Sequence, residues 1–368
     1  MGEMGLAALA ARCVKAKALY DQFGELSFRG NIDIANALKA DGLFTEAAAF
    51  FDASYQLNTA SRDALLAKLL AVIASGGDCA EADLEALKKL DDGFYRFART
   101  RSLMQKGTTD ASELLSVLRN GFETFYTGSS ADSLFITLAL PLVSPPHSSI
   151  NSSRSDIIPR RLYFYWDKNP PPEVLANIEY HQRLGIFDVL HYTKEAAIEF
   201  LDSYYGRPTR DLFLTMGHPS AESDFFRFHV INTFGGYYLD TDEKIISESL
   251  FFEEFGGSYE TVCVISGSGP IHSAFFGAVK QSPIMLECIL SLIYNSFANK
   301  DLSLWLKTGP GPITRAIARS LFRSLFCGVR LPSMRVFPPE VFPRVFGAVP
   351  MPYRDDARDW RVFEAQRN

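Results

Sequence analysis

Two aspartates that follow a short aromatic segment are the residues best suited to chemistry in this 368-residue chain. Asp240 and Asp242 come after Tyr237, Tyr238 and Leu239, whose side chains favour an extended strand. In an extended segment, residues two apart point the same way, so both carboxylates can address one hard cation such as Mn²⁺ or Mg²⁺. A calcium loop of the EF-hand type is excluded, because it requires further oxygen ligands and a glycine at its sixth position.

A helix is expected immediately before this strand, because apolar residues recur near the helical period at Phe225, Phe228, Ile231 and Phe234. Asp224 and Arg227 are three residues apart and therefore share one face of that helix. Gly235 and Gly236 can take the positive φ that ends a helix and redirects the chain. The pattern thus predicts a helix, a glycine turn and a strand that carries the aspartates.

An ordered string of residues in this region resembles a known family. It consists of Ser223, Asp224, Arg227, Gly235, Gly236, Tyr238, Asp240 and Asp242. This string is similar to that of the Asp-x-Asp sugar-nucleotide glycosyltransferases, which include the catalytic domains of the large clostridial glucosylating toxins. The resemblance implies an α/β fold of the GT-A type, with an open, twisted, mostly parallel sheet flanked by helices. It also implies a hexosyltransferase that uses a UDP-sugar or GDP-sugar donor with Mn²⁺ or Mg²⁺ and mostly retains the anomeric configuration.

The resemblance also assigns roles to residues. Those matching Asp224 and Arg227 contact the donor sugar in the family, and with Asp240 and Asp242 they form the expected catalytic set. Ser223 and Tyr238 belong to the same motif and are expected to bind the donor.

The segment upstream, IPRRLYFYW over 158–166, is similar to the first strand of the family, where a terminal tryptophan borders the nucleotide base. Tyr165 and Trp166 are therefore expected to bind the donor; the alternative is that Trp166 is a core aromatic at a strand end. A second strand is expected over 187–193, followed by a helix around 196–201. Two successive strand–helix units suggest a parallel sheet.

Three more candidates lie downstream. The sequence TGPGP over 308–312 matches the Thr-Gly-Pro of the family and makes Gly309 a donor-binding candidate. Trp360 corresponds to a tryptophan that closes over the pyrophosphate. His272 is a candidate further metal ligand, although SAFFGAVKQSPIM over 273–285 departs from the asparagine and Gly-His-Pro of the family, and a structural role is the alternative.

A basic stretch is expected to form a further helix. No acidic residue occurs between Asp301 and Glu340, whereas Arg315, Arg319 and Arg323 are spaced by four and stack on one helical face. With a helix N-terminus near residue 313, this face suits phosphate or a carboxylated substrate. The alternatives are a solvated basic face and a surface that docks to an anionic membrane.

Composition excludes several classes of protein. A net charge of −6 argues against non-specific binding of nucleic acid. The five cysteines lie far apart without a C-x-x-C pair, so neither a zinc site nor a disulfide framework is indicated. No run of about 18 apolar residues occurs, and the N-terminus lacks the features of a signal peptide. We therefore expect a cytoplasmic protein. It could also bind peripherally to the inner face of the membrane, and a secreted effector is the alternative.

The domain organisation follows from local composition. Residues 1–127 are expected to form a helical domain, 128–157 a Ser/Pro-rich linker and 158–368 the GT-A domain. Residues 37–58 resemble one tetratricopeptide unit, Gly42 and Gly76 are 34 residues apart, and Gly107 marks a third, degraded copy. A non-repetitive helical bundle is the alternative.

The expected reaction is transfer of a sugar to an acceptor hydroxyl in polysaccharide or glycolipid synthesis. The expected partners are the donor, a carbohydrate, lipid-linked or protein acceptor, and a protein bound by the helical half. One alternative is an effector that glycosylates a protein recognised by that half. Another is a non-catalytic adaptor, which the presence of Asp224, Arg227, Asp240 and Asp242 argues against.

Overall fold

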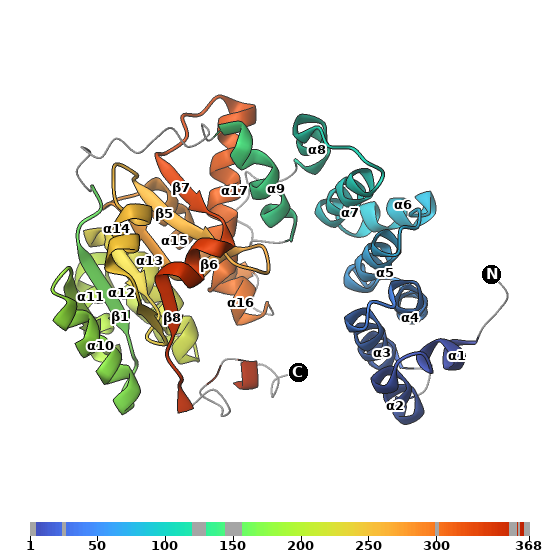
Figure 1. Cartoon of the computed structure of the whole chain (residues 1–368), viewed down its shortest axis with the longest axis horizontal. Helices are drawn as coiled ribbons and strands as arrows, with labels where there is room; N and C mark the ends of the chain where they lie inside the picture. The colour runs from blue at the N-terminus through green and yellow to red at the C-terminus, as the bar shows by residue number, and fades with distance from the viewer. Residues whose placement is uncertain are drawn as a thin grey trace. The chain divides into compact units, whose positions relative to one another are not determined.

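The computed structural model describes residues 5–23, 27–119, 130–143, 157–298, 302–352, 359 and 361–363. The chain divides into two compact units, Met1–Gly121 and Phe122–Asn368. We call them the helical unit and the α/β unit (Figure 1). The expected domain boundary at residue 127 lies outside the described residues.

The described part of the helical unit consists of short helices in succession. They are α1 (Leu6–Ala10), α2 (Val14–Phe23), α3 (Phe28–Ala40), α4 (Phe44–Leu57), α5 (Arg62–Ala74), α6 (Glu81–Leu90), α7 (Asp92–Gln105) and α8 (Ala111–Leu118). Polar side chains cap the first turns of four of them, since Ser27, Ser61, Asp91 and Asp110 each accept a backbone N–H. Local sequence therefore sets most of these helix starts.

Glycine occupies the same place in three successive helix pairs. Gly42 follows α3, Gly76 follows α5 and Gly107 follows α7, with φ of 76°, 80° and 97°. Each donates its N–H to the carbonyl three residues earlier, at 3.0–3.1 Å. A left-handed residue at this position lets the chain turn back into the next helix. The spacing of 34 residues thus separates equivalent turns; the resemblance to tetratricopeptide repeats stays a prediction.

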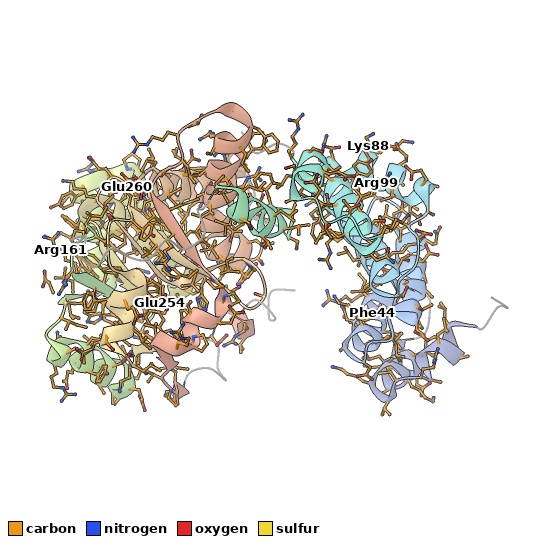
Figure 2. All side chains as sticks on the ribbon, turned by 45° about the horizontal axis from the view of Figure 1, so that its top comes forward. Phe44, Lys88, Arg99, Arg161, Glu254 and Glu260 are labelled. Atoms are coloured by element: carbon orange, nitrogen blue, oxygen red, sulfur yellow. The ribbon has the colours of Figure 1, made fainter. Side chains whose placement is uncertain are left out.

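Apolar clusters hold neighbouring helices of this unit together. Phe50 of α4 and Leu38 of α3 are fully buried in one cluster, and Leu69 of α5 belongs to a second that also includes α6 and α7. At the surface of the unit, Arg99 of α7 pairs with Glu81 of α6 at 3.4 Å, and Figure 2 labels Arg99 there. The buried apolar contacts, more than this exposed pair, are expected to stabilise the unit.

A six-stranded sheet forms the centre of the α/β unit, in the order β2-β1-β3-β6-β5-β7. The strands are β1 (Arg161–Tyr165), β2 (Asp188–Tyr192), β3 (Gly236–Leu239), β5 (Thr261–Ile265), β6 (Ile271–Ala278) and β7 (Met334–Phe337). β1 pairs in parallel with β2 and β3, and β5 pairs in parallel with β7. β6 pairs antiparallel with both β3 and β5. The expected mostly parallel α/β sheet is confirmed.

Two shorter strands form a separate antiparallel pair, β4 (Glu243–Ile245) with β8 (Phe346–Ala348). The described helices of this unit are α9 (Ser130–Val143), α10 (Pro172–Leu184), α11 (Lys194–Tyr205), α12 (Arg207–Leu214), α13 (Pro219–Phe234), α14 (Glu248–Phe255), α15 (Pro283–Ala298), α16 (Leu304–Lys307), α17 (Pro310–Cys327) and α18 (Phe342–Val345), with a 3₁₀ turn η1 (Pro339–Val341). The strands expected over 158–166 and 187–193 are β1 and β2, and the helix expected next is α11.

Helices cover both faces of the sheet (Figure 1). Leu162 and Phe164 of β1 cluster with Ile178 of α10 on one face. Tyr165 of the same strand points the other way and packs on Phe226 of α13, with ring centroids 5.5 Å apart. α10 and α13 therefore lie on opposite sides of β1, and both reach the edge of the sheet where β1 and β3 end.

The linker expected over 128–157 is wrong in its first half, because α9 (Ser130–Val143) forms there and packs on α17. Its apolar residues Leu134, Phe135, Ile136 and Ala139 are buried, which a solvated linker would not allow. Asp132 at its start is 1% exposed and pairs with Arg315 of α17 at 2.6 Å. The serine and proline content of residues 144–157 dominated the prediction, and residues 144–156 lie outside the described part.

The arginine stripe on α17 is a structural feature instead of an anion-binding face. Arg315 and Arg319 are 4% and 1% exposed, and Arg319 pairs with Glu287 of α15 at 2.6 Å. Arg323 pairs with the other oxygen of the same carboxylate at 2.8 Å. Carboxylates remote in sequence thus neutralise the stripe, which a search for nearby acidic residues cannot detect. Neither the solvated face, nor phosphate binding, nor membrane docking by this stripe is supported.

Among the described residues, none of the helices combines the length and apolar character needed to span a membrane.

Candidate active site

The glycine turn between α13 and β3 places the motif residues on adjoining elements. Gly235 and Gly236 have φ of 67° and 122°. A Cβ at Gly235 would lie 2.8 Å from the backbone nitrogen of Lys280, and a Cβ at Gly236 would lie 2.8 Å from the carbonyl oxygen of Arg161. Only glycine fits both the conformation and the space. The turn therefore brings the end of β3, with its aspartates, alongside the helix that carries Asp224 and Arg227.

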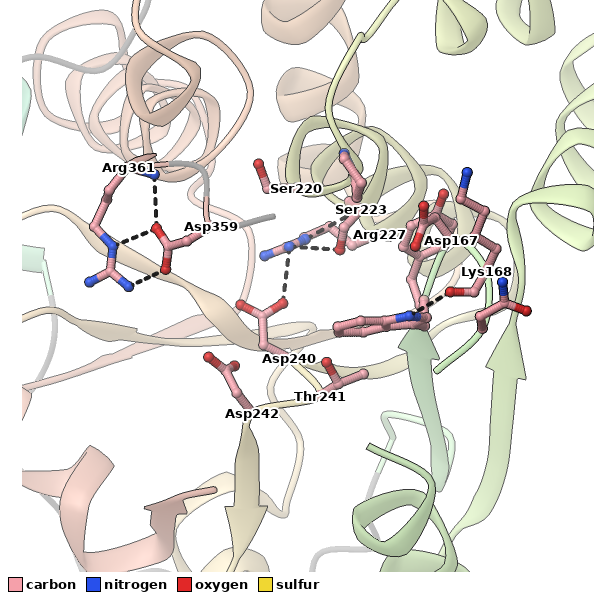
Figure 3. A pocket seen from close by; sticks show the side chains of 14 residues that line it. Asp167, Lys168, Ser220, Ser223, Arg227, Asp240, Thr241, Asp242, Asp359 and Arg361 are labelled. Atoms are coloured by element: carbon pink, nitrogen blue, oxygen red, sulfur yellow. Dashed lines mark hydrogen bonds and ion pairs between the residues drawn. The ribbon is translucent and has the colours of Figure 1, made fainter. Parts of the chain in front are cut away.

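Arg227 lies at the centre of the site and contacts two carboxylates with one nitrogen. Its Nη2 is 3.1 Å from Oδ1 of Asp224. The same nitrogen is 3.0 Å from Oδ1 of Asp240 (Figure 3). The expected shared face of Asp224 and Arg227 is thus confirmed. The guanidinium is 3% exposed, which gives these charges little solvent to screen them.

Ser223 and Tyr238 hold the same guanidinium from its other sides. Arg227 Nη2 donates to Ser223 Oγ at 2.9 Å, and Arg227 Nη1 donates to the carbonyl of Ser273. The Ser223 hydroxyl is 2.6 Å from the Tyr238 hydroxyl, and the guanidinium carbon lies 4.4 Å from the Tyr238 ring centroid. Two residues expected to bind the donor therefore position Arg227 in this structure.

The pKa values at this centre are shifted by burial and by crowding of charge. Burial raises the pKa of Asp224, against the lowering effects of Arg227 and of the Thr308 hydroxyl. Burial also raises the pKa of Asp240 to about 7; Arg227 opposes this rise, whereas the nearby carboxylates of Asp242 and Asp224 add to it. For Arg227, burial lowers the pKa but the carboxylates, Asp240 first, raise it further. The Arg227 guanidinium is thus the shared positive charge for the carboxylates of Asp224, Asp240 and Asp242.

Asp240 and Asp242 fit a small hard cation that also binds phosphate. Mg²⁺ and Mn²⁺ sites of that kind use one or two carboxylates and take their remaining ligands from substrate phosphates and water. No group of three or more potential ligand residues occurs among the described residues, so a site made of protein ligands alone is not seen there. Asp224, Asp240 and Asp242 share the single guanidinium of Arg227, so their carboxylates, when ionised, carry more negative charge than Arg227 balances. A divalent cation would balance it.

A cavity of about 410 Å³ opens on one side of Arg227 and Asp240. Its lining includes Tyr165 and Trp166, both expected to bind the donor, and the loop that follows them. The Trp166 indole donates to the carbonyl of Lys168 at 2.9 Å, which orients the ring at the end of β1 (Figure 3). Trp166 is only partly buried and has a place beside the cavity that suits stacking on a base.

Tyr165 has a different environment from Trp166. It is 4% exposed, and its hydroxyl donates to Oε2 of Glu222 at 2.8 Å. Glu222 is itself buried and pairs with Lys194 of α11. Tyr165 therefore forms part of the cavity wall, held by Glu222, whose other partner is the partly exposed Lys194. Sequence reasoning missed this ion pair, because Glu222 and Lys194 are 28 residues apart.

A second cavity of about 380 Å³ lies on the other side of the ion-paired centre. Both cavities are bordered by Ser220, Arg227, Asp240, Asp242 and Arg361. The second is also lined by Asp224, Glu243, His272, Trp305 and Gly309. A ligand with a nucleotide at one end and a sugar at the other can thus lie across the aspartates with one part in each cavity.

The Thr-Gly-Pro motif contacts Asp224 across 84 residues of sequence. The Thr308 hydroxyl donates to Oδ2 of Asp224 at 2.8 Å, and Gly309 lies next to the same carboxylate, since a Cβ there would be 3.4 Å from Oδ2. The sequence suggested Gly309 as the binding residue; the structure shows that Thr308 fixes the orientation of Asp224.

His272 does not join Asp240 and Asp242 in a metal-ligating cluster of the described residues. Its Nδ1 accepts the N–H of Ala274 at 3.3 Å, and its ring stacks on Phe342 with centroids 4.1 Å apart. Burial lowers its pKa to about 4, so the ring is neutral near pH 7. The structural role weighed for His272 agrees with these contacts.

Trp360 lies outside the described residues. Its neighbours Asp359 and Arg361 line the cavity that contains Trp166, and Arg361 Nε donates to Asp359 Oδ1 at 2.8 Å (Figure 3). The sequence did not single out either residue.

A family model matches the part of the chain that contains most of this site. Residues 152–258 match the family model described as "Glycosyltransferase sugar-binding region containing DXD motif". Among solved structures, the chain is similar to the PaToxG glycosyltransferase, with 12% sequence identity and a TM-score of 0.36, over 58% of this chain and 88% of that one. No curated protein sequence matches the chain.

The matched stretch runs from before β1 to beyond the Asp240-Thr241-Asp242 motif and includes Trp166, Asp224 and Arg227. Residues 152–258 of the α/β unit are accordingly similar to a glycosyltransferase sugar-binding region with a DXD motif, which supports a glycosyltransferase activity for the chain.

Proposed function

We propose that this protein transfers a sugar from a UDP-sugar or GDP-sugar to an acceptor hydroxyl with the help of Mn²⁺ or Mg²⁺. The observation that carries the proposal is the position of Arg227 and Asp240 between two cavities. A nucleotide fits the cavity with the partly exposed Trp166 ring, and a sugar fits the one with Asp224. The diphosphate between them would then lie against Asp240 and Asp242.

The residues of the chain perform separate tasks in this proposal. Asp240 and Asp242 would hold the cation, which when bound stabilises negative charge on the leaving diphosphate. Arg227 keeps a fixed positive charge beside the same place, and its contacts with Ser223 and Tyr238 prevent reorientation during the reaction. Asp224, oriented by Thr308, accepts hydrogen bonds from sugar hydroxyls.

We include in the proposal an acceptor that is itself a carbohydrate or a lipid-linked carbohydrate. Trp305 in the second cavity supports this, because a flat aromatic face packs well on a sugar ring. Retention of the anomeric configuration is a further part of the proposal and rests on the family resemblance. It is checked by NMR of the glycosidic linkage in the first product obtained.

The test is incubation of the full chain with a panel of UDP- and GDP-sugars and Mn²⁺, with release of the nucleoside diphosphate as the readout. One donor should be turned over, and chelation of the metal should stop the reaction. Asp240→Asn and Asp242→Asn should each remove turnover while the protein stays folded. Absence of binding and turnover with every donor, unchanged by these substitutions, would refute the proposed activity. Carbohydrate and protein acceptors offered in parallel then separate polysaccharide or glycolipid synthesis from modification of a protein.

A further inference from the structure

The main chain of the Asp-Thr-Asp turn is bonded to side chains of α10, a helix that no motif points to. Asn177 Nδ2 donates to the carbonyl of Thr241 at 2.9 Å and to that of Glu243 at 2.8 Å. Thr241 lies between the two aspartates, and Glu243 follows them directly. One buried amide thus joins both carbonyls that flank Asp242.

His181, one turn later on α10, extends this attachment into β4. Its Nε2 accepts the N–H of Ile245 at 3.2 Å. Its Nδ1 lies 2.8 Å from the carbonyl of Asn177, and since a carbonyl only accepts, Nδ1 carries the proton and Nε2 accepts. Burial lowers the pKa of His181 to about 4, which keeps the ring in this neutral form near pH 7. Tyr180 adds a bond from its hydroxyl to the carbonyl of Ile245 at 3.0 Å.

Other elements bond to the neighbouring residues Asp240 and Asp242 of the turn. The N–H of Asp240 donates to Ala274 of β6 at 2.8 Å, and the carbonyl of Asp242 accepts from Val349 at 2.7 Å. The carbonyls of Thr241 and Glu243 point toward α10 and are bonded by Asn177. The sheet and α10 thus hold alternate residues of the turn, which together restrict the rotation that would separate the two carboxylates.

We propose that Asn177 and His181 are positioning residues that set the geometry of Asp240 and Asp242 for the cation. The predicted effect on metal binding rests on the proposed function. The hydrogen bonds from α10 to the Asp-Thr-Asp turn can be tested without any ligand. Residues that orient metal ligands from behind typically contribute about 10- to 100-fold to metal affinity. Loss of either side chain should weaken Mn²⁺ binding by that factor.

The variants are chosen to keep packing while removing single hydrogen bonds. Asn177→Leu fills a similar volume without the two donors. In His181→Asn, the amide lies near the former position of Nδ1 and cannot reach Ile245. In His181→Gln, the longer side chain places its amide near the former position of Nε2, where the amide oxygen can still accept the N–H of Ile245. The matched control is His229→Asn: His229 is equally buried, has a pKa lowered to about 4, and bonds the carbonyl four residues earlier at 2.7 Å, but has no bond to the turn.

Two readouts are measured on the full chain. Hydrogen exchange of the amides in 240–246 should be at least about tenfold faster in Asn177→Leu and His181→Asn than in wild type, with β1 and α13 unchanged. Electron paramagnetic resonance titration of Mn²⁺ in the presence of UDP or GDP should show the weakened affinity. His181→Gln should recover much of both, and His229→Asn should match wild type in the turn.

The outcomes separate the two ideas. Wild-type exchange at 240–246 in both Asn177→Leu and His181→Asn, or acceleration spread evenly over the α/β unit, would overturn the positioning role. If wild type binds no Mn²⁺ with either nucleotide, the proposed function fails, and the exchange experiment still decides whether α10 holds the turn.

Discussion

The two units of this chain differ in how many charged side chains they bury. In the described part of the helical unit, Glu46 is the one buried Asp, Glu, Lys or Arg side chain, and its partner Arg12 is half exposed. In the α/β unit, buried charged residues occur on several elements: Asp132, Glu222, Asp224, Arg227, Arg315, Arg319 and Asp359. Burying a charge costs stability unless partners compensate it. The α/β unit bears this cost at its candidate site and in the ion pairs that join α17 to α9 and α15, whereas the described part of the helical unit largely avoids it.

The contrast predicts that single substitutions have large, non-local effects in the α/β unit and small, local ones in the helical unit.

The largest effect is expected for Arg227→Ala. Removing the cation leaves Asp224 buried and uncompensated, a situation that costs about 3–5 kcal/mol. Urea unfolding should show this loss in the transition of the α/β unit, with no donor turnover at any pH. Arg227→Lys, which keeps the charge but not the fork of contacts, should recover part of the stability and little of the activity. A loss below about 1 kcal/mol for Arg227→Ala would contradict the central role of this residue.

Asp240→Asn should separate activity from stability. Turnover should fall at least about 100-fold, since one of two cation ligands is lost.

The stability of Asp240→Asn should not fall in parallel with its turnover. The pKa of Asp240 is raised in the folded state to about 7, so below this value the folded protein binds more protons than the unfolded one. Wild-type stability therefore declines as pH rises from about 4 toward 7, and Asp240→Asn should flatten this decline.

The measurement is chemical denaturation without metal at several pH values, for wild type and Asp240→Asn. A marked destabilisation by Asp240→Asn at pH 8 would show that the pair with Arg227 outweighs the cost of burying the carboxylate. That result would reverse the sign of the predicted effect.

Thr308→Val tests the long-range contact to Asp224. It removes the hydroxyl donor and keeps the shape, which should cost about 1–3 kcal/mol because a buried carboxylate loses a hydrogen bond. Since Asp224 also loses its orientation, KM for the donor should rise. Thr308→Ser is the control and should restore most of both. Unchanged KM with lowered stability would restrict Thr308 to a structural role.

The smallest effect is expected in the helical unit, for Ser61→Ala. The Ser61 hydroxyl accepts the N–H of Ala64 at the start of α5, and loss of such a cap costs about 1 kcal/mol. Thermal unfolding should show a modest shift in the transition of the helical unit alone, with donor turnover unchanged. Ser61→Asp should restore the cap. A change in turnover would show that the two units are coupled in energy.

The errors at the sequence level share one physical cause. Arg315, Arg319 and Arg323 form the predicted helical stripe, but Asp132 and Glu287 neutralise it from other helices. The structural alternative for His272 likewise rests on contacts that the sequence does not show, its stacking on Phe342 and the bond that its Nδ1 accepts from Ala274. A sequence shows the charge and type of each residue. It does not show which distant residues neutralise that charge or contact that side chain.

Local sequence was sufficient to determine the parts of this protein that depend on neighbouring residues. The spacing of Asp224 and Arg227, the Gly235-Gly236 turn and the strand that ends at Asp240 follow from helical period, left-handed backbone and strand propensity. Tertiary structure alone determined which residues that are distant in sequence contact one another at the candidate site. It joined Thr308 to Asp224 and Asn177 to the Asp-Thr-Asp turn, and it buried Arg227 between two cavities. Such contacts join residues 64 or 84 positions apart, and only packing of the sheet and its helices brings them into hydrogen-bonding distance.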